Sequence, residues 1–149
     1  MRKQVLYKEF LTRIDDNIAK GAYLEASWYA YAVLEDRLRS MLTNTGGDGK
    51  NKGNGKPIWG FEKKLDTLID RAQADDLLKQ SLPTDDIDKW RLKRNELIHG
   101  MADGSLTIEQ IDLQAIELAN RGRDFARIYC AAAQRLKKHR TKIAVPTLI

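Results

Sequence analysis

The chain has 149 residues, of which 42% are hydrophobic and 32% are charged, a composition typical of a globular domain with a sizeable core. Its 26 basic and 21 acidic residues give a formal net charge of +5, a weak indication of a polyanionic partner. A single cysteine, Cys130, excludes an intrachain disulfide and favours a reducing compartment. No apolar run reaches the roughly 18 residues of a membrane span, and no signal-peptide-like region opens the chain, so we expect a cytoplasmic protein without a membrane partner.

The first 43 residues carry two runs of apolar residues at helical spacing. They predict one helix over residues 3–20 and a second over residues 22–43, separated by a break at Gly21. The apolar face of the second helix carries Leu24, Trp28, Tyr31, Leu38 and Leu42. Both helices therefore have one face suited to a core.

The middle of the chain combines a glycine-rich stretch with a third helix. Residues 44–57 contain no large apolar side chain and predict a mobile linker, whose lysines are able to contact an RNA backbone. The stretch is not a phosphate-binding loop, because Lys56 is followed by Pro57 and no strand precedes it. The third helix is predicted over residues 58–81, with a break near residues 73–76.

Two further helices are predicted in the second half of the chain. One covers residues 85–100, where Gly100 suits a C-terminal stop. The other opens at Thr107, and Gln110 three residues later completes a capping-box pattern. A strict three-four spacing then extends for about 30 residues. Its positions are Ile108, Ile111, Ala115, Leu118, Gly122, Phe125, Tyr129, Ala132 and Leu136. Because the stripe contains alanine and glycine, we expect a neighbouring helix to approach closely there.

The overall pattern indicates the fold class. No strand pattern and no internal repeat stands out, so the sequence predicts an all-α protein, an antiparallel helical bundle of about five helices. We expect a single domain over residues 1–140 and a loose tail over residues 141–149.

Two charged residues fall on apolar helix faces. The fourth helix carries Ile87, Trp90, Leu97, Ile98 and Met101 in one arc, and Arg94 falls inside that arc. Glu35 falls inside the apolar face of the second helix. Burying either charge alone costs on the order of several kcal/mol, so we expect Glu35 and Arg94 to meet. Two interpretations stay open: Glu35 aims the guanidinium at a cleft, or the ion pair only fixes the register of the helices.

Asn95 and His99 lie four residues apart and flank the face of Arg94. A histidine transfers protons near neutral pH, an arginine holds a phosphate through two hydrogen bonds, and an asparagine orients either group. This set suits metal-independent cleavage of RNA, in which the 2′-hydroxyl attacks the adjacent phosphate. One histidine cannot easily be both acid and base, so a symmetric dimer would supply the second copy. Alternatively, His99 is a surface group at a helix end.

The stretch RNELIHG, with Arg94, Asn95 and His99, resembles the signature of the HEPN superfamily, an arginine followed after four to six residues by a histidine. The stretch YAVLEDRLRSML, residues 31–42, is also similar to an earlier helix of that family, where an acidic residue near Glu35 supports the motif. The helical plan covers most of the chain, whereas these two stretches carry the resemblance specifically.

The resemblance implies a homodimer whose two motifs face a shared cleft, with Arg94 and His99 catalytic and with Asn95 and Glu35 supporting them. It implies a metal-independent endoribonuclease that needs no cofactor and acts on RNA, of the kind found in toxin–antitoxin, abortive-infection and CRISPR systems. An antitoxin or another defence-system protein would be a further partner.

The resemblance also has limits that the residues show. One toxin branch carries a tyrosine two residues after the histidine, which its antitoxin modifies; here that position is Met101, so we place the chain outside that branch. Some relatives keep the fold without nuclease activity. The alternative function is therefore a non-catalytic module that binds RNA or nucleotides, or that mediates dimerisation.

The remaining noteworthy residues are expected to be structural. His139 lies in the basic stretch RLKKHR, a solvated helix end with some affinity for polyanions. The chain has no clustered Cys/His set, so no metal site is expected. The residues expected in the core rather than in a site are Trp28, Trp59, Trp90 and Cys130.

Overall fold

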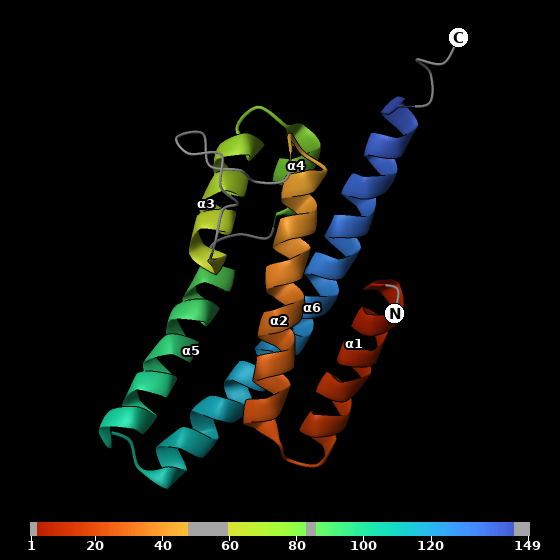
Figure 1. Ribbon diagram of the computed structural model, residues 1–149. Helices are drawn as coiled ribbons and strands as arrows, with labels where there is room; N and C mark the ends of the chain where they lie inside the picture. Colours follow the sequence, from red (N-terminus) through yellow and green to blue (C-terminus); the bar gives the residue numbers. More distant parts are fainter. Residues whose placement is uncertain (1–2, 48–59, 83–85, 145–149) are drawn as a thin grey trace. The chain divides into compact units, whose positions relative to one another are not determined.

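The computed structural model describes residues 3–47, 60–82 and 86–144, and these residues form helices and no strand (Figure 1). The helices are α1 (Lys3–Ala19), α2 (Tyr23–Thr43), α3 (Phe61–Ala72), α4 (Asp76–Ser81), α5 (Asp86–Asp103) and α6 (Ile108–Ala144). The predicted all-α fold class is confirmed. Within the described ranges, no helix is long and apolar enough to cross a membrane.

The helices of the first half follow the predicted pattern closely. Gly21 ends α1 with φ 79°, and the Ala22 N–H closes the turn by donating to the Asn17 carbonyl at 2.7 Å. The predicted break near residues 73–76 separates α3 from α4. The predicted linker over residues 44–57 lies mostly outside the described residues, and so does Trp59.

The end of α5 differs from the prediction. The helix continues past Gly100 to Asp103, and Gly104 follows it with φ 72°. Gly100 is buried within the helix, and a Cβ at this position would lie only 2.6 Å from Cγ of Leu106. Gly100 therefore provides space for the connection between α5 and α6, and Gly104 provides the stop.

The start of α6 has the predicted capping box. The Thr107 N–H donates to Oε1 of Gln110 at 2.9 Å, and the Gln110 N–H donates to Oγ1 of Thr107 at 3.2 Å. The far end differs from the prediction, because α6 runs to Ala144 and residues 141–144 are helix rather than tail. Residues 145–149 of the predicted tail lie outside the described residues.

Thr107→Ala is expected to lower the free energy of unfolding by about 1 kcal/mol, because the first turn of α6 loses the hydroxyl that accepts from the Gln110 N–H. Urea denaturation measures the change. Thr107→Ser keeps the hydroxyl and serves as the control, and equal stability of the two variants would show that the cap does not contribute.

The described residues group into two compact units. Unit 1 comprises the described parts of Met1–Val33 and Thr84–Arg127, and unit 2 comprises those of Leu34–Pro83 and Ile128–Ile149. Both α2 and α6 contribute residues to both units. The single domain expected over residues 1–140 stays a prediction.

The core of unit 1 is centred on Trp90, which is 2% exposed. Its ring stacks on Tyr31 with a centroid distance of 6.4 Å, and its indole N–H donates to the Leu118 carbonyl at 2.9 Å. Gly122 faces the same ring, since a Cβ there would lie 2.9 Å from Cζ2 of Trp90 and 3.0 Å from Cβ of Ala30. The close helix approach expected at the small residues of the α6 stripe is thus confirmed.

The core of unit 2 brings α3 and α4 together with the second half of α2 and of α6. Its largest buried side chains are Leu34, Leu38, Met41, Leu42, Phe61, Leu68, Leu78 and Tyr129. Arg71 secures the end of α2, because its Nη1 donates to the Leu42 carbonyl at 2.8 Å. A carbonyl of the last turn that has no partner within its own helix is satisfied in this way.

Several residues expected in the core are not buried. Trp28 is 57% exposed, and Ile98 and Met101 are also exposed. The buried face of α2 instead carries alanines at positions 26 and 30, because close approach to Gly122 requires a small side chain such as Ala30. The expectation for Trp28 was therefore wrong, whereas that for Trp90 is confirmed. Cys130 is half-buried, and burial raises the pKa of its thiol.

Candidate functional site

Arg94 lies at the middle of α5, and Asn95 and His99 lie in its C-terminal half, all within unit 1. Arg94 and Asn95 are half-buried, and His99 is exposed. The helix therefore offers a partly shielded cation and, a little more than one turn further on, an imidazole that solvent reaches.

An aromatic column positions Arg94. Its guanidinium carbon lies 4.0 Å from the centroid of the Tyr31 ring, and Tyr31 in turn stacks on the buried Trp90 at an interplanar angle of 27°. A cation over an aromatic ring gains roughly 0.5–2 kcal/mol, depending on how far it is desolvated. Tyr31 is a contact of Arg94 that the sequence reasoning missed. Its place on the apolar face of α2, one turn before Glu35, was the available signal.

Glu35 has a different contact, within unit 2. Its Oε1 accepts a hydrogen bond from Nζ of Lys64 at 3.1 Å, and the Lys64 side chain is only 7% exposed. Lys64 lies on the face of α3 that also buries Phe61 and Leu68, so its ammonium needs the carboxylate. Because Glu35 and Arg94 belong to different units, their meeting stays a prediction.

His99 lies one turn before Asp103, at the end of α5. Hydrogen bonds from Ser105 hold the pKa of the exposed Asp103 carboxyl below its ordinary value, and the nearby charge of His99 adds to this effect. The Ser105 N–H donates to Oδ1 of Asp103 at 2.9 Å. The imidazole is therefore close to a carboxylate that stays ionised at neutral pH.

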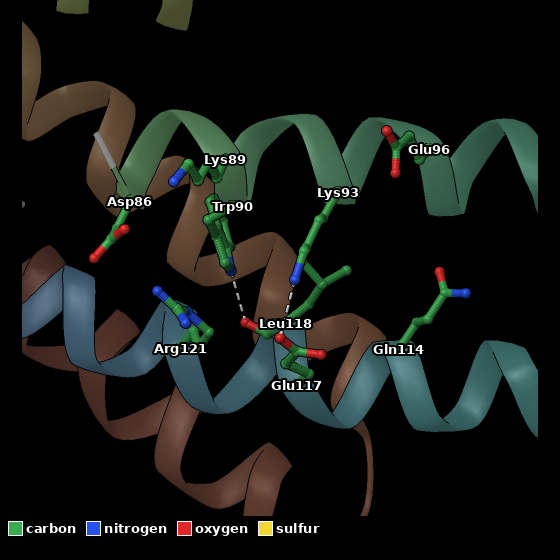
Figure 2. A pocket seen from close by; sticks show the side chains of 9 residues that line it. All are labelled: Asp86, Lys89, Trp90, Lys93, Glu96, Gln114, Glu117, Leu118 and Arg121. Carbon is green, nitrogen blue, oxygen red and sulfur yellow. Dashed lines mark hydrogen bonds and ion pairs between the residues drawn. The ribbon is translucent and has the colours of Figure 1, made fainter. Parts of the chain in front are cut away.

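A cleft of about 510 Å³ lies between α5 and α6 within unit 1 (Figure 2). Its lining residues are Asp86, Lys89, Trp90, Lys93, Glu96, Gln114, Glu117, Leu118 and Arg121. Lys93 and Glu117 close the cleft across its middle with an ion pair of 3.2 Å. Of the RNELIH stretch, Glu96 lines this cleft, whereas the three candidate site residues Arg94, Asn95 and His99 do not.

The residues described here include no group of three His, Cys, Asp or Glu side chains placed to hold a metal ion. Comparison of the chain with models of protein families, with curated proteins and with solved structures finds no match. The geometry of α5 and its motif is therefore the available basis for a functional proposal.

Proposed function

We propose that this chain is an HEPN-type, metal-independent endoribonuclease in which Arg94 and His99 are catalytic. The observation that carries the proposal is the arrangement on α5: the guanidinium of Arg94 is held over the Tyr31 ring, and the exposed imidazole of His99 follows on the same helix. A fixed cation and an accessible proton carrier are the two groups that RNA cleavage without a metal requires.

The chemistry follows from these two groups. The 2′-hydroxyl of one nucleotide attacks the adjacent phosphorus, and the bond to the 5′-oxygen of the next nucleotide breaks. One imidazole takes the 2′-hydroxyl proton, and an imidazolium gives a proton to the departing 5′-oxygen. Arg94 binds the phosphate oxygens and stabilises the charge that develops on them. Asn95 orients these groups, and Glu35 supports the motif from α2.

We propose that a homodimer completes the site, because each chain brings one histidine from the motif while the reaction needs an acid and a base. Exposed apolar side chains accompany the motif: Ile98 and Met101 on α5 are 41% and 43% exposed. Such side chains are suited to burial against a second copy. In this proposal the protein acts in the cytoplasm as a toxin or phage-defence component, with an antitoxin or another defence-system protein as a further partner.

Incubation of the purified protein with labelled RNA in excess chelator is expected to yield fragments that end in a 2′,3′-cyclic phosphate and begin with a 5′-hydroxyl. These ends follow from attack by the 2′-hydroxyl. The chelator inhibits any contaminating nuclease that depends on a metal ion. Fragments ending in a 3′-hydroxyl, or an absence of cleavage by the dimer, would contradict the proposal. Light scattering on the same sample reports the oligomeric state.

The contact between Arg94 and Tyr31 also favours the alternative, a non-catalytic RNA-binding, nucleotide-binding or dimerisation module in which Arg94 is structural. That alternative predicts no RNase activity. It further predicts that Arg94→Ala lowers the melting temperature while His99→Ala changes little, because His99 is exposed.

A further inference from the structure

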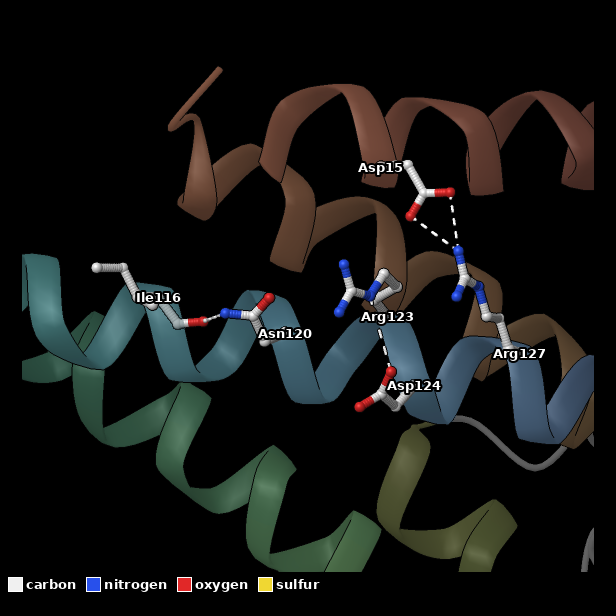
Figure 3. Close-up of polar contacts among 6 residues, drawn as sticks. All are labelled: Asp15, Ile116, Asn120, Arg123, Asp124 and Arg127. Atoms are coloured by element: carbon white, nitrogen blue, oxygen red, sulfur yellow. Dashed lines mark hydrogen bonds and ion pairs between the residues drawn. The ribbon is translucent and has the colours of Figure 1, made fainter. Parts of the chain in front are cut away.

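The charges along α6 are distributed unevenly. Between Ile108 and Arg127 the helix carries both signs, and two of its arginines contact acidic side chains. Arg127 binds both carboxylate oxygens of Asp15 at 3.1 and 2.9 Å, and Arg123 lies 3.7 Å from Asp124 (Figure 3). This half of α6 is therefore electrostatically balanced by contacts within unit 1.

The other half of α6 has no such balance. From Ile128 to Ala144 the sequence contains no Asp or Glu, and its basic residues are Arg135, Lys137, Lys138, Arg140 and Lys142. Arg135 and Lys138 are exposed. Neither has an ion-pair partner among the residues that the structure describes. This half of α6 therefore contributes positive charges alone, and two of them are exposed.

The geometry of the helix brings these two cations together. Arg135 and Lys138 are three residues apart, so their Cβ atoms lie on one side of the helix at about 5–6 Å. Leu136 is buried on the opposite side, and Arg140 donates a hydrogen bond to the Thr43 carbonyl at the end of α2. Packing and this hydrogen bond therefore fix which side of α6 presents Arg135 and Lys138 to solvent.

A stabilising role in the helix does not explain these charges. Cations favour the negative end of a helix dipole within its last turn, but Arg135 lies more than two turns before Ala144. A membrane surface is also a poor match, because a helix that binds the interface inserts large apolar side chains. Among the described side chains from Ile128 to Arg140, Ile128 is the single exposed large apolar one, at 45%, and one such side chain offers little apolar area for insertion.

We infer that the C-terminal turns of α6 bind the sugar–phosphate backbone of RNA, with Arg135 and Lys138 contacting phosphates. The choice of RNA rests on the proposed function; the anionic backbone is argued from the charge of α6 itself. Backbone contacts of this kind are independent of base sequence and release counterions, so binding weakens steeply as salt rises. This surface adds affinity for the substrate and takes no part in the cleavage step.

The test measures binding of a fluorescent single-stranded RNA with 2′-O-methyl groups, which cannot be cleaved by 2′-hydroxyl attack. Fluorescence anisotropy over a series of salt concentrations gives the affinity and its salt dependence. Replacing both residues, Arg135→Gln with Lys138→Gln, is expected to reduce the slope of log affinity against log salt by about 1.4, since each phosphate contact on a single strand contributes about 0.7. At about 0.1 M salt this corresponds to roughly 10- to 30-fold weaker binding.

The matched control removes two exposed lysines elsewhere in the same unit, Lys63→Gln with Lys79→Gln, and is expected to bind RNA almost as the wild type does. Equal losses in the two variants would overturn the inference, because they would indicate a net-charge effect. Binding to anionic lipid vesicles in place of RNA would overturn it too. Cleavage of unmodified RNA by the wild type is measured separately. The binding assay therefore tests the RNA-binding surface, and the cleavage assay tests the nuclease proposal.

Discussion

His99→Ala is expected to lower the rate of RNA cleavage at least about 100-fold, because loss of a positioned general acid or base removes a contribution of about 10²–10⁴. The side chain is exposed, so the fold should be unaffected and the free energy of unfolding should change by less than about 0.5 kcal/mol. The measurement pairs single-turnover cleavage rates in chelator with urea denaturation of the same preparations.

A structural role for His99 would give a different result, and two further samples separate the cases. Imidazole added to the His99→Ala protein is expected to restore part of the rate, because it replaces the missing proton carrier. Glu96→Ala removes a neighbouring exposed side chain of α5 and serves as the matched control, with cleavage close to wild type. Full activity of His99→Ala would refute the assignment of this residue.

The helices were largely predictable because their signals are local. The spacing of apolar residues gave α1 and α2, and the Thr107–Gln110 capping box gave the start of α6. The end of α5 was less predictable, because a glycine can end a helix or allow close packing. Gly100 allows close packing, because the Leu106 side chain lies against it. The position of Leu106 depends on tertiary structure, which the local sequence does not reveal.

In the candidate site, too, the exposure of a side chain follows from local sequence, whereas its contacts with other helices depend on tertiary structure. Helical phase put Arg94 on the apolar face of α5, where the structure finds it half-buried, and His99 on the flank of that face, where the structure finds it exposed. The sequence alone did not identify the aromatic contact of Arg94 with Tyr31, or the ion pair of Glu35 with Lys64, because each depends on which helices become neighbours. A charge on an apolar face predicts that a partner exists and leaves the choice of partner to packing.

The face of α2 that becomes buried illustrates why hydrophobicity alone was insufficient. Trp28 is more hydrophobic than Ala30, yet Trp28 is exposed and Ala30 is fully buried. Helices that approach closely need small side chains at their contact, here Ala30 and Gly122. The Trp90 ring fills the space next to Gly122. The alanine and glycine positions of α2 and α6 therefore determine how unit 1 packs.

Gly122→Leu is consequently expected to lower the free energy of unfolding by about 3 kcal/mol, at the upper end of the range for overpacked cores. Even a single Cβ at this position would lie 2.9 Å from the Trp90 ring, which the hydrogen bond to the Leu118 carbonyl holds in place. Ala131→Leu makes a comparable substitution at an exposed position of the same helix, and a change within about 0.5 kcal/mol is expected there. Urea denaturation compares the two variants.

A double-mutant cycle identifies Trp90 as the cause of that loss. Gly122→Ala gains helix propensity of about 1 kcal/mol, which partly offsets the clash, so the cycle uses this smaller change. Trp90→Phe removes the Cζ2 atom that a Cβ at position 122 would approach. The double variant is therefore expected to be more stable than the sum of the two single changes implies, with a coupling of at least about 0.5 kcal/mol. Strict additivity would mean that Gly122 and Trp90 do not pack against each other, and the arrangement that supports Tyr31 and Arg94 would then be incorrect.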